Sequence, residues 1–217
     1  MNWNDGSRER LLGCAEVLLG FGVLPPVLGF FCPPATWIPV LWALALAAAW
    51  MLRRETPPAA FCPSRSLLKA EVPRILWRFG LVSVVMLVIV WFWLPGQLFA
   101  LPRQKPGLWV AVLVLYPLWS VYPQELLFRR WFFHRYAPLF GDGAGIVLAS
   151  ALFFGWAHVV MHNGLAVLLS LGGWLFAQTY RRTRSLVLAC LEHALYGDMV
   201  FTIGLGSFFF HGAVGRA

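Results

Sequence analysis

The residues of this sequence that could do chemistry are the few ionisable side chains inside its apolar stretches. They are Glu16, Glu125, Arg129, His158, Glu192, His193 and Asp198. Placing a charged side chain inside a bilayer costs at least about 2.5–3.5 kcal/mol on insertion scales, so such residues are candidates for function. Glu16 lies only a turn or so inside its stretch, and we expect no catalytic role for it.

Glu125 and Arg129 are four residues apart, so on a helix they share one face and can form an ion pair. If that helix continues to Tyr136, Glu125 lies roughly 16 Å from the helix end. By the same arithmetic His158 and His193 lie roughly 22 and 12 Å inside their own stretches. The three groups are therefore predicted to meet at compatible depths. The alternative is an earlier helix end, with Glu125 and Arg129 solvated.

A carboxylate beside two imidazoles suggests hydrolysis of an amide bond without a covalent intermediate. A carboxylate in a low-dielectric cavity holds a proton more readily than in water, so Glu125 could act as the general base that activates water. His158 and His193 could orient that water or donate hydrogen bonds to a developing oxyanion. Arg129 would hold the carboxylate. This chemistry requires no cofactor and no metal.

Composition predicts that these residues act in a membrane. Hydrophobic residues make up 60% of the 217 residues and charged residues 12%, against roughly 25% charge in soluble domains. Disorder is excluded, because it requires low hydrophobicity. The net charge of +8 falls among apolar runs and in no nucleic-acid-binding module, so it indicates membrane topology and a lipid bilayer as partner. No feature indicates an oligomeric state.

The predicted fold is all-α: a single polytopic transmembrane helical bundle, residues 1–217, with about seven spans and a range of six to eight. Each predicted span is close to the roughly 20 residues that cross a bilayer. N-terminal helices occupy 1–106 and catalytic helices 107–210, and the polar connection 53–74 is predicted to be a loop. The apolar stretches are 11–31, 35–52, 75–95, 107–135, 143–161, 164–180 and 185–206.

Basic residues predict the orientation in a cell (plasma or inner) membrane. With seven spans and a cytoplasmic N-terminus, the cytoplasmic side collects Arg8, Arg10, Arg53, Arg54, Arg65, Lys69, Arg74, Arg78, Arg130, Arg135, Arg181, Arg182 and Arg184. The opposite side holds only Arg103, Lys105 and Arg216. This asymmetry is the one that the positive-inside rule requires.

Three motifs resemble the CAAX-protease and bacteriocin-processing family of intramembrane glutamic endopeptidases, also called Abi. They are QELLFR at 124–129, FGWAH at 154–158, and His193 within EHALYGDMVFTIGLG. They occur in the family's order. The residues around these motifs also resemble the myxosortase-like group, whose members are associated with C-terminal sorting signals.

The resemblance implies a role for each matched position. In the family's first motif a Glu-Glu pair precedes three residues and an Arg, and the first Glu activates water. Here Gln124 and Glu125 occupy the pair, and Arg129 matches the arginine. His158 would position the water. His193 would belong to the oxyanion site. The implied substrate is a membrane-anchored protein, or one that is prenylated or carries a sorting signal.

Two departures from the family pattern affect the mechanism. Gln124 cannot be a base, so either Glu125 takes that role or the chain is inactive. Adjacent helical residues point about 100° apart, so this exchange requires a rotated or distorted helix, which Pro123 could provide. The family's Asn, four residues after the last His, is Gly197 here. Asp198 would serve the oxyanion only when protonated, and a structural role is the alternative.

Other functions remain open alternatives. His158 and His162 have the i, i+4 spacing of two zinc ligands on a helix, which would make a zinc-dependent intramembrane protease. However, HVVMH lacks the glutamate of H-E-x-x-H proteases. A second alternative is a catalytically inactive membrane scaffold or bacteriocin-immunity protein of the same fold. Glu192, beside His193 but pointing about 100° away from it, is expected to have a pairing or supporting role and not a catalytic one.

Overall fold

The computed structural model describes residues 7–55 and 63–209, and within them it is helical, with no strand. The predicted all-α class is confirmed. Six helical segments of this part are long and apolar enough to cross a membrane: Arg10–Phe31, Pro34–Glu55, Arg65–Trp93, Pro106–Phe140, Ala144–Met161 and Leu186–Ile203. Arg216, one of the bases used to predict orientation, lies outside the described residues.

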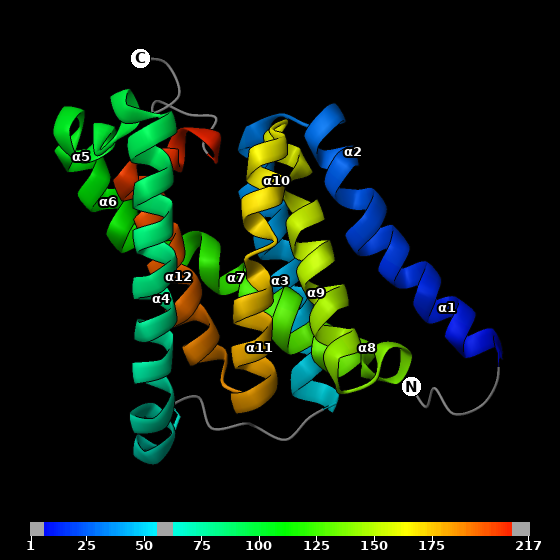
Figure 1. The fold of residues 1–217 in the computed structure, drawn as a ribbon. Helices are drawn as coiled ribbons and strands as arrows, with labels where there is room; N and C mark the ends of the chain where they lie inside the picture. Colours follow the sequence, from blue (N-terminus) through cyan, green and yellow to red (C-terminus); the bar gives the residue numbers. More distant parts are fainter. Residues whose placement is uncertain (1–6, 56–62, 210–217) are drawn as a thin grey trace.

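The first three spans flank the centre of the bundle. The first comprises α1 (Ser7–Val17), a π-helical segment at Leu18–Val23 and α2 (Leu24–Phe31). It leans away from the other helices at its N-terminal end (Figure 1). The others are α3 (Trp37–Glu55) and α4 (Arg65–Trp93), and the short α5 (Ala100–Gln104) follows α4.

The fourth span is a long helical rod of changing pitch. It comprises α6 (Pro106–Tyr116), a π-helical segment at Pro117–Val121, α7 (Tyr122–Glu125), a second π-helical segment at Leu126–Trp131, and α8 (Phe132–Phe140). Pro117 begins the first π-helical segment, and there a wide turn accommodates the missing backbone donor and the crowding that proline causes; the second segment contains no proline. The helix is therefore distorted on both sides of Gln124 and Glu125.

The predicted span 164–180 is not continuous. It is divided into α10 (Gly164–Ser170) and α11 (Gly173–Thr183), which follow one another along α9 (Ala144–Ala157) in Figure 1. The break falls at Leu171-Gly172. There Leu171 packs so closely on Gly155 that an added Cβ at Gly155 would lie 2.7 Å from Leu171 Cδ2. The bundle thus has six continuous spans and one interrupted segment, and α12 (Leu186–Ile203) ends it.

The prediction of a loop over 53–74 is wrong for most of its length. Helix α3 continues to Glu55, and α4 begins at Arg65, where the Ser64 side chain accepts a hydrogen bond from the Leu67 amide at 3.2 Å. Residues 56–62 lie outside the described part. The charged residues that the prediction assigns to the loop extend both helices instead. They can do so because long basic side chains reach water from a helix end.

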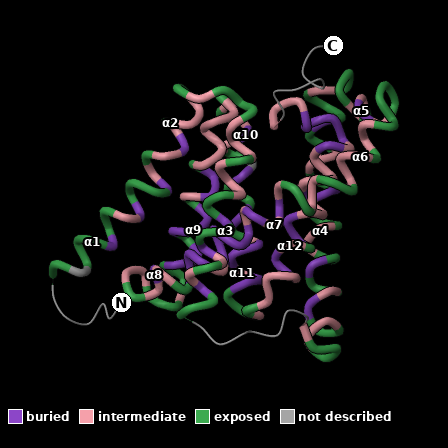
Figure 2. The backbone as a smooth tube through the Cα atoms, turned by 180° about the vertical axis from the view of Figure 1, so that it is seen from behind, coloured by how far each residue is buried: buried purple, intermediate pink, exposed green. Residues whose placement is uncertain are grey.

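Burial is concentrated in the inner helices. In Figure 2 the buried segments lie mainly along α7, α9, α11 and α12, whereas α1 and much of α4 are exposed or intermediate. Aromatic rings fill the centre, and Phe132, Phe133 and Phe154 are at most 2% exposed. The outer faces carry apolar side chains such as Trp77 and Trp93, at 75% and 73% exposure. An exposed apolar surface of this kind suits a lipid environment.

A buried polar network ties α4 to α11 and α12. Glu192 is fully buried and forms an ion pair with Arg78 at 2.9 Å, and Thr179 donates a hydrogen bond to its other oxygen at 2.6 Å. Two turns before Arg78 on the same helix, Glu71 accepts hydrogen bonds from Arg182. Of the two roles expected for Glu192, pairing or support, the ion pair with Arg78 shows pairing. A bilayer supplies no hydrophobic force between helices, so these contacts contribute to holding α12 in register.

Removal of the Glu192 carboxylate should destabilise the protein. Glu192→Ala leaves Arg78, which is a quarter exposed and also bonded to Thr179, without its carboxylate partner, so the loss should approach the roughly 3 kcal/mol of a broken buried pair. The measurement is thermal unfolding in detergent. Glu55→Ala is the matched control, because the Glu55–His134 pair is a third exposed, and such pairs contribute at most about 1 kcal/mol. Equal losses for the two variants would contradict this account of α12.

Candidate active site

Glu125 lies at the centre of the bundle with both carboxylate oxygens occupied. It is fully buried, and Arg129 Nε approaches Oε2 at 3.1 Å in an ion pair that lacks the alignment of a hydrogen bond. His193 Nδ1 lies 2.9 Å from Oε1. The predicted ion pair within the fourth span and the predicted meeting of Glu125 with His193 are both confirmed.

Arg129 joins three helical segments. Its Nη1 donates a hydrogen bond to Ser150 Oγ at 2.6 Å, and its Nη2 donates one to the Gly173 carbonyl at 3.0 Å. The guanidinium carbon lies 4.8 Å from the centre of the Phe154 ring. Glycine is required at 173, since an added Cβ would lie 2.5 Å from Phe154 Cδ1. The fully buried guanidinium thus fixes the break between α10 and α11 against the fourth span.

His193 connects the buried carboxylate to a second polar group. Because a carboxylate can only accept, Nδ1 of His193 carries the proton that it donates to Glu125. In the neutral ring Nε2 is then an acceptor, and the Tyr116 hydroxyl lies 3.0 Å from it. The ring stacks on Phe176 with centroids 4.6 Å apart and planes 12° from parallel. The imidazole is therefore held at both nitrogens and on one face.

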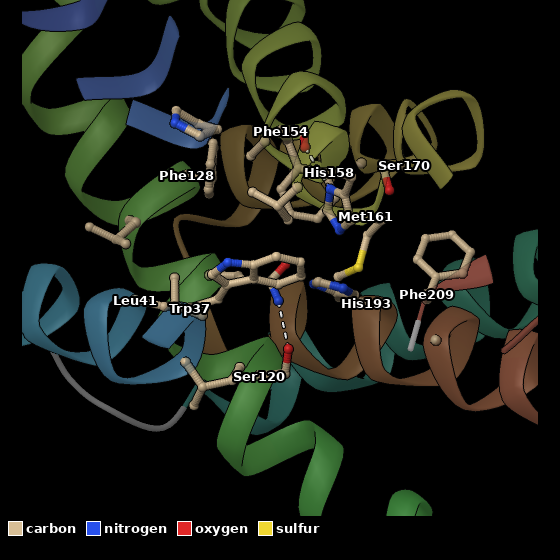
Figure 3. A pocket seen from close by; sticks show the side chains of 18 of the residues that line it. Trp37, Leu41, Ser120, Phe128, Phe154, His158, Met161, Ser170, His193 and Phe209 are labelled. Atoms are coloured by element: carbon tan, nitrogen blue, oxygen red, sulfur yellow. Dashed lines mark hydrogen bonds between the residues drawn. The ribbon is translucent and has the colours of Figure 1, made fainter. Parts of the chain in front are cut away.

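A cavity of about 1260 Å³ borders this group. Its lining is mainly apolar, and the polar residues along it include Tyr116, Ser120, Gln124, His158 and His193. Figure 3 shows the rings of His158 and His193 pointing into the same part of the cavity, close to Met161. Glu125 is not among the lining residues.

His158 faces the cavity with an unprotonated nitrogen when it is neutral. Its Nδ1 lies 2.8 Å from the Phe154 carbonyl, to which it donates a hydrogen bond, so Nε2 is left as an acceptor. His158 begins the 3₁₀ segment His158–Met161 that follows α9. Gln124 also lines the cavity, and its Nε2 donates a hydrogen bond to Ser120 Oγ at 2.7 Å. Both side chains therefore present an acceptor atom for water.

The structure separates His162 from His158. His162 has a left-handed backbone, with φ of 50°, and it ends the 3₁₀ segment, so the two residues do not share one α-helical face. Its Nε2 pairs with the Gly29 carbonyl at 2.8 Å. Among residues 7–55 and 63–209, no group of three or more His, Cys, Asp or Glu side chains could hold a metal ion.

Asp198 does not line the cavity, although its carboxylate interacts electrostatically with Tyr116. Its backbone carbonyl accepts a hydrogen bond from Thr202 at 2.6 Å. Its Oδ1 atom is buried and has no hydrogen-bond partner within the described part of the chain. The oxyanion role considered for Asp198 finds no support in this placement.

Sequence reasoning missed Tyr116, Ser150 and Gly173. Ser150 and Gly173 contact Arg129 only because α9 and α11 pack against the fourth span, and the sequence does not specify this packing. Tyr116 left a signal, because it places a hydroxyl group within a long apolar stretch directly before a proline.

The fold and this site define a polytopic α-helical membrane protein with a carboxylate–imidazole pair beside an apolar cavity. Residues 106–197 match the model of the family described as type II CAAX prenyl endopeptidase Rce1-like. The match covers less than half of the chain, and over this segment it supports the predicted resemblance to the CAAX-protease and bacteriocin-processing family, a family of peptidases. No curated protein and no solved structure matches the chain. The myxosortase-like placement and the division at residues 106 and 107 remain predictions.

Arg129→Lys tests the architecture of this site. A lysine ammonium cannot reach Glu125, Ser150 and the Gly173 carbonyl together, since it lacks the planar fork of guanidinium. Hydrogen bonds to charged groups contribute about 1.5–3 kcal/mol each, so the free energy of unfolding should fall by at least about 2 kcal/mol. Thermal unfolding in detergent measures this change. Arg130→Lys at the neighbouring position is the control, and an equal effect there would refute the assignment.

Proposed function

We propose that this protein is an intramembrane endopeptidase that cleaves membrane-anchored proteins near the anchored end. The observation that carries the proposal is the placement of His193, which is bonded to buried Glu125 through Nδ1 and lines the cavity. A buried carboxylate on the Nδ1–H of an imidazole holds the ring in the correct tautomer and stabilises the imidazolium ion that forms when Nε2 takes a proton. Nε2 of His193 is then the general base for water.

In this mechanism Glu125 acts through His193. The sequence-based hypothesis has Glu125 take the proton from water directly, but both of its oxygens are occupied and it does not line the cavity. Glu125 is therefore a positioning residue, and Arg129 holds it. His158 Nε2 and the Gln124 carbonyl oxygen, both acceptors on the cavity wall, orient the water. No metal ion takes part.

The cavity suits a peptide substrate that reaches the site from the bilayer. Its volume of about 1260 Å³ exceeds the roughly 300–1000 Å³ of small-molecule pockets, and its wall is mainly apolar. An extended peptide with apolar side chains fits such a space. The proposed substrates are prenylated proteins or proteins that carry a sorting signal.

We also propose that the N-terminus faces the cytoplasm of a cell membrane. In Figure 1 the ends of α3 and α11 and the start of α4, which carry most of the bases, lie at one end of the bundle. The short α5, with Arg103, lies at the other end. The positive-inside rule assigns the more basic end to the cytoplasm.

A second candidate function is an inactive scaffold or immunity protein. It is favoured by Gln124, which faces the cavity at the position where the family's first glutamate activates water. If His193 cannot replace that glutamate, the bundle has no base in its cavity. Gln124→Glu separates the two functions, because it puts a carboxylate on the cavity wall.

The test compares protein termini in membranes of cells that carry wild-type protein, His193→Gln, Glu125→Gln or Gln124→Ala, read by mass spectrometry. Termini made by the enzyme should vanish with His193→Gln and fall by roughly 100-fold or more with Glu125→Gln, because general-base catalysis contributes about 10²–10⁴-fold. Gln124→Ala should lower their rate of formation less. A chelator should leave them unchanged.

Two results would reverse this conclusion. If the protein termini found with wild-type protein persist in His193→Gln, the proposed peptidase mechanism is wrong. No wild-type termini, together with new ones in Gln124→Glu, would establish the inactive scaffold. Thermal unfolding of each variant in detergent confirms that a lost terminus reflects chemistry and not misfolding.

A further inference from the structure

Tyr116 places a hydroxyl group between the cavity and the proposed base. It is the last residue of α6 and lines the cavity, and its Oη lies 3.0 Å from His193 Nε2. The tyrosine ring meets the imidazole edge-on, with centroids 6.0 Å apart and planes at 79°. A second edge-on contact, to Phe201 with centroids 5.5 Å apart, also holds the ring. The hydroxyl is thus held in place beside the reacting nitrogen.

Gly197 makes this position possible. It lies one turn after His193 on α12, and a Cβ added there would lie 2.2 Å from Tyr116 Cε1 and 2.4 Å from Tyr116 Oη. No other residue type could stand at 197 without displacing the tyrosine. The hydroxyl from α6 therefore occupies the space that a side chain of α12 would otherwise fill.

Resting on the proposed function, we propose that Tyr116 is a catalytic residue that donates a hydrogen bond to the oxyanion of the tetrahedral intermediate. In the resting protein its O–H is donated to Nε2 of His193, which keeps that nitrogen unprotonated. When water occupies this position on Nε2, the hydroxyl is released toward the cavity. Donors aimed at the developing charge are usually the largest single contribution to such catalysis.

The step balances without a co-reactant. The water oxygen forms a bond to the carbonyl carbon while its proton passes to Nε2, and the carbonyl electron pair moves to oxygen. The resulting oxyanion accepts a hydrogen bond from Tyr116, which keeps its own proton. Collapse of the intermediate re-forms the carbonyl, breaks the C–N bond and transfers the Nε2 proton to the leaving amine.

The other cavity-lining groups described above are less suited to this role. His158 uses its Nδ1–H on the Phe154 carbonyl, and in the neutral ring its Nε2 can only accept. Gln124 uses an N–H on Ser120. Tyr116, by contrast, gains a free O–H at the moment when water binds to the base.

Tyr116→Phe removes the hydroxyl and keeps the ring. With a peptide that spans a His193-dependent cleavage site as substrate, we expect kcat to fall roughly 100-fold to 1000-fold, the usual cost of losing one oxyanion donor. KM should stay within about twofold, since the interaction forms only in the transition state. Tyr122→Phe is the control, because that ring packs near Trp42 and does not line the cavity. It should retain wild-type kcat and KM.

A rescue variant separates donation from packing. Tyr116→Ala should lose activity, and Tyr116→Ala combined with Gly197→Asn should recover part of it, because an amide donor then occupies the vacated space. Wild-type kcat in Tyr116→Phe, or a change in KM alone, would overturn the proposal. If the termini also persist in His193→Gln, the proposed function fails and this inference with it. If cleavage depends on His193 but is unchanged in Tyr116→Phe, only the inference about Tyr116 fails and the proposed function stands.

Discussion

The ion pair between Glu125 and Arg129 is the constraint on which the rest of this structure depends. Both side chains are fully buried, and removing two charges from water costs several kcal/mol per ion unless other polar groups compensate. Compensation comes from His193 on α12, Ser150 on α9 and the Gly173 carbonyl at the start of α11. Because these groups come from separate helices, the pair is satisfied only when all of them are packed around the fourth span. The interruption between α10 and α11 belongs to the same requirement, since it brings the Gly173 carbonyl within reach of the guanidinium.

The rotation of α12 is fixed by two neighbouring residues that point in different directions. Glu192 faces α4 and α11, where Arg78 and Thr179 hold it, and His193 faces the fourth span, where Glu125 and Tyr116 hold it. Successive helical residues differ by about 100°, so α12 cannot rotate without breaking both sets of contacts. The imidazole orientation thus follows from a polar network outside the cavity as well as from its own hydrogen bonds.

Much of the site could be predicted because burial of charge in an apolar sequence is conspicuous. The i, i+4 spacing predicted the pair of Glu125 with Arg129, and the estimated depths predicted that Glu125 meets His193. The side of the helix that faces the cavity could not be predicted, because two π-helical segments flank the Gln124-Glu125 pair and alter the angular position of each residue. Tyr116 contacts His193 across 77 positions of sequence, and no local pattern specifies such a contact. The charged ends of α3 and α4 were mistaken for a loop because charge outside an apolar run reads equally as helix end or as coil.

The two departures from the family pattern have a common physical explanation in the packing of the fourth span on α12. With Gln124 on the cavity wall and Glu125 behind it, a carboxylate can influence the cavity only through the imidazole of α12. With glycine at 197, a hydrogen-bond donor beside that imidazole must come from another helix, and Tyr116 of α6 fills the space. Under the proposed mechanism, base and donor are both assembled across the same helix–helix contact. A shift of α6 against α12 would separate Tyr116 from His193, so the chemistry depends on close packing at Gly197 as much as on the ionisable residues themselves.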